Sequence, residues 1–345
     1  MIACKQVSQY VGLDVHKKTI YGYVMDIQGH LIFEKEFKTQ PHELDMFLLN
    51  VKKDDSIVAI ESCSCWQYAY DYLDDAGYNL KLAHPLGIKA LKKIKKHTDK
   101  YDAKLLADLL RTNMLPESYA APEDIRVKRQ ITRHRHSLTN IGNEIKNKIH
   151  AILLRHGYEV PYSDAFCKSA IAYLREINLP ECDRFELHQY LDTIELLNKQ
   201  KSRCSEVIEN IASDDPQVRL AMTMPGIGHY AATTFVAEVG DIRRFDKADQ
   251  VASFAGLVPK VHQSGEKTKL SHITKQGNTN LRHVMVQAAN VAVHHDKTLR
   301  KTYNRLKHKG HNIAIVAIAR RMVTLLYVML KNNIKYHDLQ IHKAT

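Results

Sequence analysis

The sequence lacks the features of several large protein classes. Its six cysteines form no Cys-x-x-Cys pair and no zinc-finger spacing, and Cys63 and Cys65 lie too close together for an ordinary disulfide bridge. Reduced thiols in a cytosolic compartment are therefore expected. The stretch from Met1 to Gln9 has no apolar segment of the kind that a secretory signal peptide needs.

Long hydrophobic runs are also missing. The most apolar stretch, Ile313 to Leu330, is interrupted by Arg320 and Arg321, so we expect a buried helix there and no membrane span. The chain has no internal repeat and no low-complexity tail. A cytoplasmic, nucleoid-associated protein without a membrane partner is the expectation.

Positive charge is what the chain has in excess. Lys and Arg total 50 against 38 Asp and Glu, which gives a net charge of +12. Such an excess favours a polyanionic partner, and the clustering of the basic residues favours nucleic acid over a merely well-solvated surface. The length of 345 residues predicts two or three domains.

The first segment alternates strands and helices in the order of a ribonuclease-H-like α/β fold. Strands are expected at 10–17, 19–26, 31–37, 56–61 and 79–83, with helices beginning at Pro41 and Trp66. The first three strands form an antiparallel meander, and the nearly all-apolar fourth strand is expected beside the first at the sheet centre.

Four acidic residues stand out in this fold. Asp14 lies in the apolar first strand, where a carboxylate is costly unless something neutralises it, and Glu61 ends the fourth strand. Asp99 and Asp102 share one face of a helix that Thr98 would cap. Together they predict a site for Mg²⁺ or Mn²⁺, whereas the helix pair alone would be explained by the helix dipole.

Basic residues lie on both sides of the acidic helix. Lys92, Lys93, Lys95 and Lys96 precede it, and Arg129 and Arg133 follow it. A charged run is usually a solvated face, but two runs around an acidic pocket predict a path for a phosphate backbone. Asp108, further along the same helix, is expected to be solvated.

The middle of the chain predicts two long helices, at 125–154 and 185–211. The second helix carries an approximate heptad seam of Leu187, Leu191, Ile194, Leu197, Val207, Ile208 and Ile211. The two helices could form an antiparallel hairpin or a coiled-coil arm that joins protomers, and a plain helical linker domain is the alternative.

A Gly-x-Gly turn follows between two further helical patterns. Gly226 and Gly228 in Met224-Pro-Gly-Ile-Gly228 fit a helix-hairpin-helix element, whose backbone N–H groups bind phosphate. The alternative is an ordinary turn between helices. The C-terminal part is expected to be mostly α-helical.

Several motifs, taken in order, resemble the DEDD transposases of the Piv/MooV type, the insertion sequence one-ten family. Toward the N-terminus they are Gly-Leu-Asp-Val-His-Lys17, Ala-Ile-Glu-Ser62 and Asp99-Lys-Tyr-Asp102-Ala-Lys. Toward the C-terminus they are Pro225-Gly-Ile-Gly228, Phe254-Ala-Gly-Leu-Val-Pro259, Gln263-Ser264-Gly265, Ile273-Thr-Lys-Gln-Gly277 and Leu281-Arg282. Thr274 stands where many members carry serine, a conservative departure.

The resemblance implies a site-specific DNA recombinase. It implies a RuvC-like nuclease domain at 1–122, a helical coiled-coil region for oligomerisation at 123–213 and a transposase domain at 214–345. It also implies that Asp14, Glu61, Asp99 and Asp102 are the four catalytic acids and that Ser264 is a nucleophile on DNA. Homodimers or homotetramers with a site shared between protomers, and a structured guide RNA that selects donor and target DNA, are implied as well.

From the residues alone, Ser264 is ambiguous, because serine before glycine is common in turns and the sequence around it predicts a hairpin. Ser253 is the second candidate, in a helix at 248–255 where it is expected to pack. Lys267 and Lys269 are candidates for phosphate contact or simple solvation. Two other functions stay open, a hydrolytic RuvC-like structure-specific nuclease and a non-catalytic nucleic-acid-binding protein.

Overall fold

The computed structural model describes residues 7–91, 98–264, 267–273 and 276–341 of the 345. The chain divides into two compact units, which meet in the sequence between Ala120 and Ala121. We call them the N-terminal and the C-terminal unit. The division into three domains stays a prediction.

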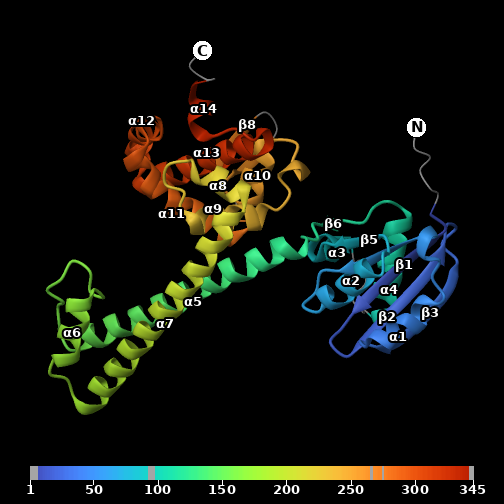
Figure 1. The fold of residues 1–345 in the computed structure, drawn as a ribbon, viewed down its shortest axis with the longest axis horizontal. Helices are drawn as coiled ribbons and strands as arrows, with labels where there is room; N and C mark the ends of the chain where they lie inside the picture. Colours follow the sequence, from blue (N-terminus) through green and yellow to red (C-terminus); the bar gives the residue numbers. More distant parts are fainter. Residues whose placement is uncertain (1–6, 92–97, 265–266, 274–275, 342–345) are drawn as a thin grey trace. The chain divides into compact units, whose positions relative to one another are not determined.

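The N-terminal unit is built on one six-stranded sheet (Figure 1). Its strands are β1 (Gln9–Val15), β2 (Thr19–Asp26), β3 (Leu31–Lys38), β4 (Ser56–Glu61), β5 (Leu80–Ala83) and β6 (Glu117–Ser118). They are ordered β3-β2-β1-β4-β5-β6. The predicted meander and the pairing of β1 with β4 are confirmed, because β1 runs antiparallel to β2 and parallel to β4. The short strand β6 adds an edge that the sequence did not predict.

Helices cover both faces of this sheet. They are α1 (Pro41–Leu48), α2 (Trp66–Asp75), α3 (Pro85–Leu91) and α4 (Asp99–Arg111). Phe47 of α1 and Leu73 of α2 pack with Leu13 on one face, whereas α3 and α4 contribute Ile88 and Leu106 to a separate core. The alternation in β1 predicted this, since Leu13 and Asp14 face opposite layers.

Gly12 lets α4 lie directly on β1. A Cβ at Gly12 would stand 2.0 Å from the carbonyl oxygen of Ala103 and 2.9 Å from the backbone nitrogen of Ala107. Both alanines are fully buried in α4. The helix backbone therefore touches the strand two residues before Asp14, which leaves the first turn of α4 close to that carboxylate.

The C-terminal unit begins with a long pair of helices. Helices α5 (Glu123–Arg155) and α7 (Glu181–Asp214) lie side by side, joined by a segment that holds α6 (Lys168–Glu176) (Figure 1). Leu187, Leu191 and Ile194 of the predicted seam are buried against Ile149 and its neighbours. Val207 is 46% exposed, so the predicted seam was wrong at that residue, whereas Ile208, its neighbour in the same prediction, is fully buried.

The remainder is a helical core with one β-hairpin. It comprises α8 (Pro216–Met222), α9 (His229–Val239), α10 (Ala248–Phe254), β7 (Pro259–Ser264), β8 (Lys267–Ile273), α11 (Thr279–His295), α12 (Lys297–Leu306), α13 (His311–Asn332) and α14 (Tyr336–Ile341). By length and apolar composition α13 could cross a membrane. Its residues Ile318, Met322 and Leu326 are fully buried in the unit's core, as predicted for a buried helix.

A fully buried carboxylate joins α5 to this core. Glu238 of α9 is 0% exposed and accepts two hydrogen bonds from Arg133, at 2.7 Å and 2.6 Å. The side-chain amides of Asn278 and Asn280 also donate to it, at 2.6 Å and 3.4 Å. Burial alone would raise the pKa of Glu238, but Arg133 and Asn278, with the charge of Arg129, hold that pKa below its ordinary value.

The contact at Gly12 predicts a large cost for Gly12→Ala. The added Cβ must displace the α4 backbone, and overpacking of this kind costs about 1–3 kcal/mol. We expect the urea midpoint of the N-terminal unit to fall accordingly. Gly142→Ala is the control, because a Cβ there meets nothing within 4 Å in the interior of α5. That change should stabilise the protein by about 0.5–1 kcal/mol, and equal losses from both variants would contradict the argument.

Arg133→Ala should cost more stability than Glu238→Gln. Removing Arg133 leaves the buried Glu238 carboxylate without its charged partner, which costs about 3 kcal/mol of stability. Glu238→Gln instead leaves an arginine that is 50% exposed and can be hydrated. Because the pKa of Glu238 is lowered in the folded state, its pairing stabilises the wild type above the ordinary carboxyl value of 4.5 and is lost as the pH falls through the lower folded value.

The stability of the wild type and that of Arg133→Ala should therefore depend differently on pH. On acidification the wild type should lose stability through Glu238, while Arg133→Ala should lose less, because its stranded carboxylate can take up a proton. Unfolding by urea from neutral pH to about pH 3 measures this difference. Parallel pH profiles for the wild type and Arg133→Ala would contradict the assignment.

Candidate metal centre

Asp14 is held at the centre of the sheet, one residue before the end of β1. Its residue exposure is 9%, and it faces the layer of α4. Burial is the largest cause of its raised pKa, and the charges of Asp102 and Asp99 raise that pKa further. His16 acts in the opposite direction through its charge and a hydrogen bond. Asp14 thus lies in a crowded acidic environment.

Asp99 and Asp102 lie in the first turn of α4, as predicted. Thr98 caps the helix, since its Oγ1 accepts a hydrogen bond from the backbone N–H of Tyr101 at 3.2 Å. The cap fixes where α4 begins, and the contact at Gly12 fixes its distance from β1. The negative charges of both acids raise the pKa of Asp14, which indicates that both lie near it.

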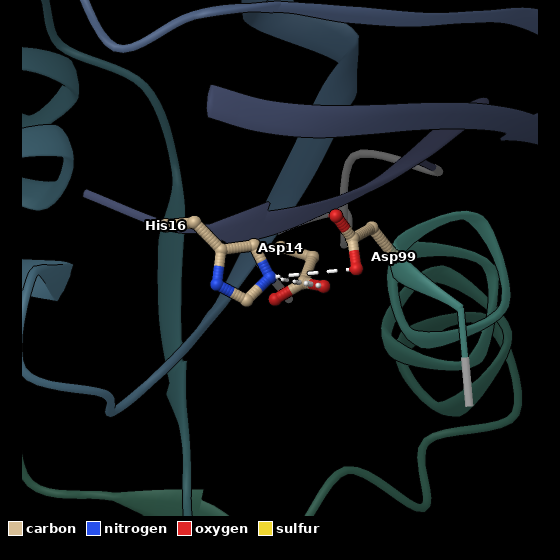
Figure 2. Close-up of side chains that lie close together, drawn as sticks. All are labelled: Asp14, His16 and Asp99. Atoms are coloured by element: carbon tan, nitrogen blue, oxygen red, sulfur yellow. Dashed lines mark hydrogen bonds and ion pairs between the residues drawn. The ribbon is translucent and has the colours of Figure 1, made fainter. Parts of the chain in front are cut away.

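His16 joins this site, although the sequence did not predict it as a ligand. Its Nε2 lies 3.2 Å from Oδ2 of Asp14 and 3.6 Å from Oδ1 of Asp99 (Figure 2). Asp14, His16 and Asp99 offer ligand atoms that all lie within 4.8 Å of one another. The i, i+2 spacing of Asp14 and His16 was the available signal, because it puts both side chains on one face of the strand end.

Glu61 lies at the matching end of the neighbouring strand. Leu13 pairs with Ile60 in the parallel β1–β4 ladder, so Asp14 and Glu61 are the next residues on adjacent strands. Glu61 is half-buried, and neither it nor Asp102 belongs to the close group of three. The structure therefore brings Asp14 and Asp99 together with His16 and places Glu61 at the adjoining strand end.

The donors at this site suit a divalent cation. Carboxylate oxygens favour Mg²⁺ or Mn²⁺, and an imidazole nitrogen is compatible with Mn²⁺. The acids around Asp14 raise its pKa because their negative charges repel, and a bound cation would relieve that repulsion. The residues present thus fit the predicted metal.

The serine candidates lie in the C-terminal unit. Ser264 is the last residue of β7 and pairs with Lys267 of β8, so the predicted hairpin is confirmed with Ser264 at its end. The side chains of Lys267 and Lys269 are outside what the structure describes. Ser253 lies in α10 as predicted, but it is exposed, because the buried face of that helix is formed by Val251 and Ala252.

The basic candidates have different surroundings. Lys92, Lys93, Lys95 and Lys96 lie outside the described residues. Arg129 donates to the backbone carbonyls of Ala237 and Glu238, at 2.7 Å and 3.2 Å, and Arg133 pairs with the Glu238 carboxylate. These contacts use both guanidinium groups within the chain, and phosphate binding by them stays a prediction. Asp108 is 47% exposed and pairs with Arg111, as expected for a solvated acid.

The two glycines of the Gly-x-Gly turn have different roles. Gly226 has φ +84°, and a Cβ there would meet the Ala288 carbonyl oxygen at 2.7 Å, so the turn requires glycine. Gly228 caps α9 with an extended backbone, and a Cβ there would meet nothing within 4 Å. The close packing against α11 is thus a property of Gly226 alone, and the helix-hairpin-helix assignment stays a prediction.

Comparison with known families gives two matches. A family model described as Transposase, of the DEDD type of IS110, matches residues 11–157. A second, described as Transposase IS116/IS110/IS902 family, matches residues 218–304. The first contains Asp14, Glu61, Asp99 and Asp102, and the second contains Ser264.

Two individual proteins are similar along nearly the whole chain, and a third is similar over about a third of it. A transposase for insertion sequence element IS1328 of Yersinia enterocolitica is 25% identical over 92% of this chain and 96% of its own length. A probable family 20 transposase of Pseudomonas aeruginosa is 25% identical over 94% of the chain and 98% of its own length. A pilin gene-inverting protein of Moraxella bovis is 33% identical over 36% of the chain and 39% of its own length.

Asp14→Asn should stabilise the metal-free protein. A buried acid with a raised pKa weakens the fold at neutral pH, and its stability cost disappears as the pH falls and the carboxyl is protonated. Removing the charge should raise the melting temperature of the N-terminal unit by about 3–6 °C, the shift that about 1 kcal/mol produces in a domain of this size. Scanning calorimetry without and with Mn²⁺ or Mg²⁺ measures this.

The same variant should lose the stabilisation that the cation gives the wild type. Asp108→Asn is the matched control, because it removes an exposed carboxylate from α4, the helix that carries Asp99 and Asp102. That control should keep the full response to Mn²⁺. An equal response in Asp14→Asn would exclude Asp14 as a ligand.

Proposed function

We propose that this chain, which belongs to the IS116/IS110/IS902 transposase family, is an enzyme that cuts and rejoins DNA when an insertion sequence moves. The observation that carries the proposal is the convergence of Asp14, His16 and Asp99, with the charge of Asp102 acting on Asp14. Burial and repulsion between these acids destabilise the fold, so a catalytic role explains their arrangement better than a structural one.

Asp14, Glu61, Asp99 and Asp102 are the proposed catalytic carboxylates and would hold Mg²⁺ or Mn²⁺. When bound, the cation supplies positive charge to the phosphodiester and activation of an oxygen nucleophile. The chain's own part is to hold these carboxylates on a central strand and a capped helix. The Nε2 of His16, 3.2 Å from Asp14 Oδ2 and 3.6 Å from Asp99 Oδ1, can add an imidazole nitrogen to this set of donors.

Ser264 is the proposed nucleophile. Its Oγ would attack a DNA phosphorus, so that a serine–phosphate ester forms, the bond from phosphorus to a deoxyribose oxygen breaks, and that oxygen leaves with the serine proton. Attack by a DNA hydroxyl on the ester would reverse the sequence and release the serine. Both steps exchange one phosphate ester for another, so no energy source is needed.

The proposal includes two kinds of partner besides donor and target DNA. A structured guide RNA suits the net charge of +12, and a homodimer or homotetramer suits the long α5–α7 pair as a coiled-coil arm. Both features accord with the family resemblance. The expected place of action is the nucleoid.

A hydrolytic RuvC-like nuclease is the second candidate. The observation in its favour is that Asp14, His16 and Asp99 lie entirely within the N-terminal unit. Such an enzyme would cut DNA with water as the nucleophile and would form no protein–DNA ester. A non-catalytic nucleic-acid-binding protein is weaker, because it gives the crowded acids no role.

A trapped adduct distinguishes these candidates. With end-labelled element DNA and Mg²⁺, the wild type should give a covalent protein–DNA species on denaturing gels and strand-exchange products. Ser264→Ala should abolish both, while Asp14→Asn should reduce them about 100-fold or more, because loss of a residue that only supports a metal ligand already costs about 10–100-fold. Both variants should still fold and bind DNA.

Ser253→Ala is the control for the serine, because Ser253 is exposed in the same unit and lies outside β7. It should retain full activity. Strand exchange at the normal rate by Ser264→Ala would exclude the covalent mechanism, and metal-dependent cleavage without an adduct would favour the hydrolytic nuclease.

A further inference from the structure

The C-terminal unit contains a cavity that the proposed chemistry does not use. It has a volume of about 640 Å³ and is bounded by helices α5, α7, α9 and α11. This volume is within the range of small-molecule and cofactor sites. We call it the Tyr230 cavity, after the tyrosine in the first turn of α9.

Flat and aromatic groups form much of its wall. The guanidinium of Arg135 lies over the Tyr230 ring, 4.1 Å from its centroid, and Arg135 Nε donates to Ser205 Oγ at 2.9 Å. The rings of His136 and His283 lie with centroids 4.6 Å apart. Flat surfaces of this kind are those on which unstacked bases lie in protein complexes.

The two histidines add aromatic surface without adding charge. Burial lowers the pKa of His136, and burial together with the charge of His136 lowers the pKa of His283. Both rings are therefore neutral at neutral pH. The side-chain amides of Asn143 and Gln287 also line the cavity and offer donors and acceptors for the edge of a base.

A group of cations adjoins the cavity. It consists of Arg135, Lys146 and Lys201, and we call it the Lys201 cluster. Burial is the largest cause of the lowered pKa of Lys201, and the nearby charges of Arg135 and Lys146 lower that pKa further. Lys146 and Lys201 line a smaller hollow that shares Thr139 and Asn143 with the Tyr230 cavity.

The cluster lacks acidic partners within the described part of the chain. Lys201 donates to the Asn198 side chain at 3.2 Å, and Lys146 lies over the Phe166 ring, with no carboxylate within ion-pair distance of these lysines or of Arg135 there. Like charges held together without counter-charges cost free energy, and a phosphate would offset that cost.

We propose that the C-terminal unit binds one unpaired nucleotide of a nucleic acid, with its base in the Tyr230 cavity and its phosphate on the Lys201 cluster. The inference rests on the proposed function only in that nucleic acid is the partner. Single-stranded RNA and single-stranded DNA both supply this chemistry, and base stacking with backbone neutralisation is the usual way in which such strands are bound.

The experiment uses the full chain in buffer with chelator, so that binding is measured without metal-dependent chemistry. The probes are fluorescent RNA and DNA oligonucleotides of one sequence, each single-stranded or paired, with affinity measured by anisotropy at several salt concentrations. A second set carries a photoreactive thiopyrimidine, so that the crosslinked peptide can be identified by mass spectrometry.

Tyr230→Ala should weaken single-strand binding by about tenfold, the usual effect of losing one stacking platform, without changing the salt dependence. Lys201→Gln should weaken binding and lower the slope of log affinity against log salt by about 0.7, the value for one phosphate of a single strand. Crosslinks should fall on the Tyr230 or His283 peptide.

Gly228→Leu tests the cavity without removing packing. A Cβ at Gly228 meets nothing within 4 Å, and the residue lines the cavity with an extended backbone, so a larger side chain is tolerated by the fold and occupies the space. It should weaken single-strand binding as Tyr230→Ala does. This variant keeps the inference testable if Tyr230→Ala fails to fold.

Tyr162→Ala and Lys199→Gln are the matched controls, because both residues are exposed and lie away from the cavity lining. Neither should change affinity. Tighter binding of the RNA probe identifies RNA as the source of the nucleotide, and tighter binding of the DNA probe identifies DNA.

Two results would overturn the inference. One is equal affinity of the wild type and Gly228→Leu for both single strands, and the other is crosslinking only outside the cavity. The Ser264 adduct is scored separately: its absence together with a clear Gly228→Leu effect would overturn the covalent mechanism and leave the nucleotide site standing.

Discussion

The close contact between β1 and α4 at Gly12 is the constraint on which the acidic site depends. A helix backbone can approach a strand to this distance only where the strand residue has no Cβ. The approach sets the first turn of α4 beside Asp14, so that two further acids act on its pKa. The fold thus brings like charges together, and His16 is the neighbour whose charge and hydrogen bond lower the pKa of Asp14.

Much of the N-terminal unit could be predicted because its strands are marked by short patterns of neighbouring residues. The period-two pattern gave the strand faces, and the apolar fourth strand gave the centre of the sheet. Asp14 could be chosen because a carboxylate in an apolar strand breaks a local expectation, and Asp99 could be chosen only in combination with Asp14 and Glu61. His16 could not be ranked in the same way, since a histidine at the end of a strand is ordinary until the helix with Asp99 is placed against it.

The basic residues of α5 could not be assigned roles from the neighbouring sequence. The basic residues follow one another closely in the sequence, but the helix turns them toward different neighbours. Arg133 reaches a carboxylate 105 positions away and Arg135 reaches the Tyr230 ring. A residue two positions further on is rotated by about 200° around the helix. Which arginine serves the fold and which stays available to a ligand is therefore decided by tertiary partners, and Glu238 in the mostly apolar α9 could not be foreseen as one of them.

The Glu238 carboxylate also bears on the β-hairpin whose first strand, β7, ends at Ser264. Asn278, which donates to Glu238, also donates its backbone N–H to the Phe254 carbonyl oxygen at 2.7 Å. Beside it, Gly277 has φ +123° and allows no Cβ, since one would stand 2.4 Å from that oxygen. The base of the hairpin is thus held by a buried ion pair, two amides and a backbone contact that only glycine permits. Because a nucleophile must return to one place in each cycle, a hairpin fixed at its base suits Ser264 better than an unsupported loop would.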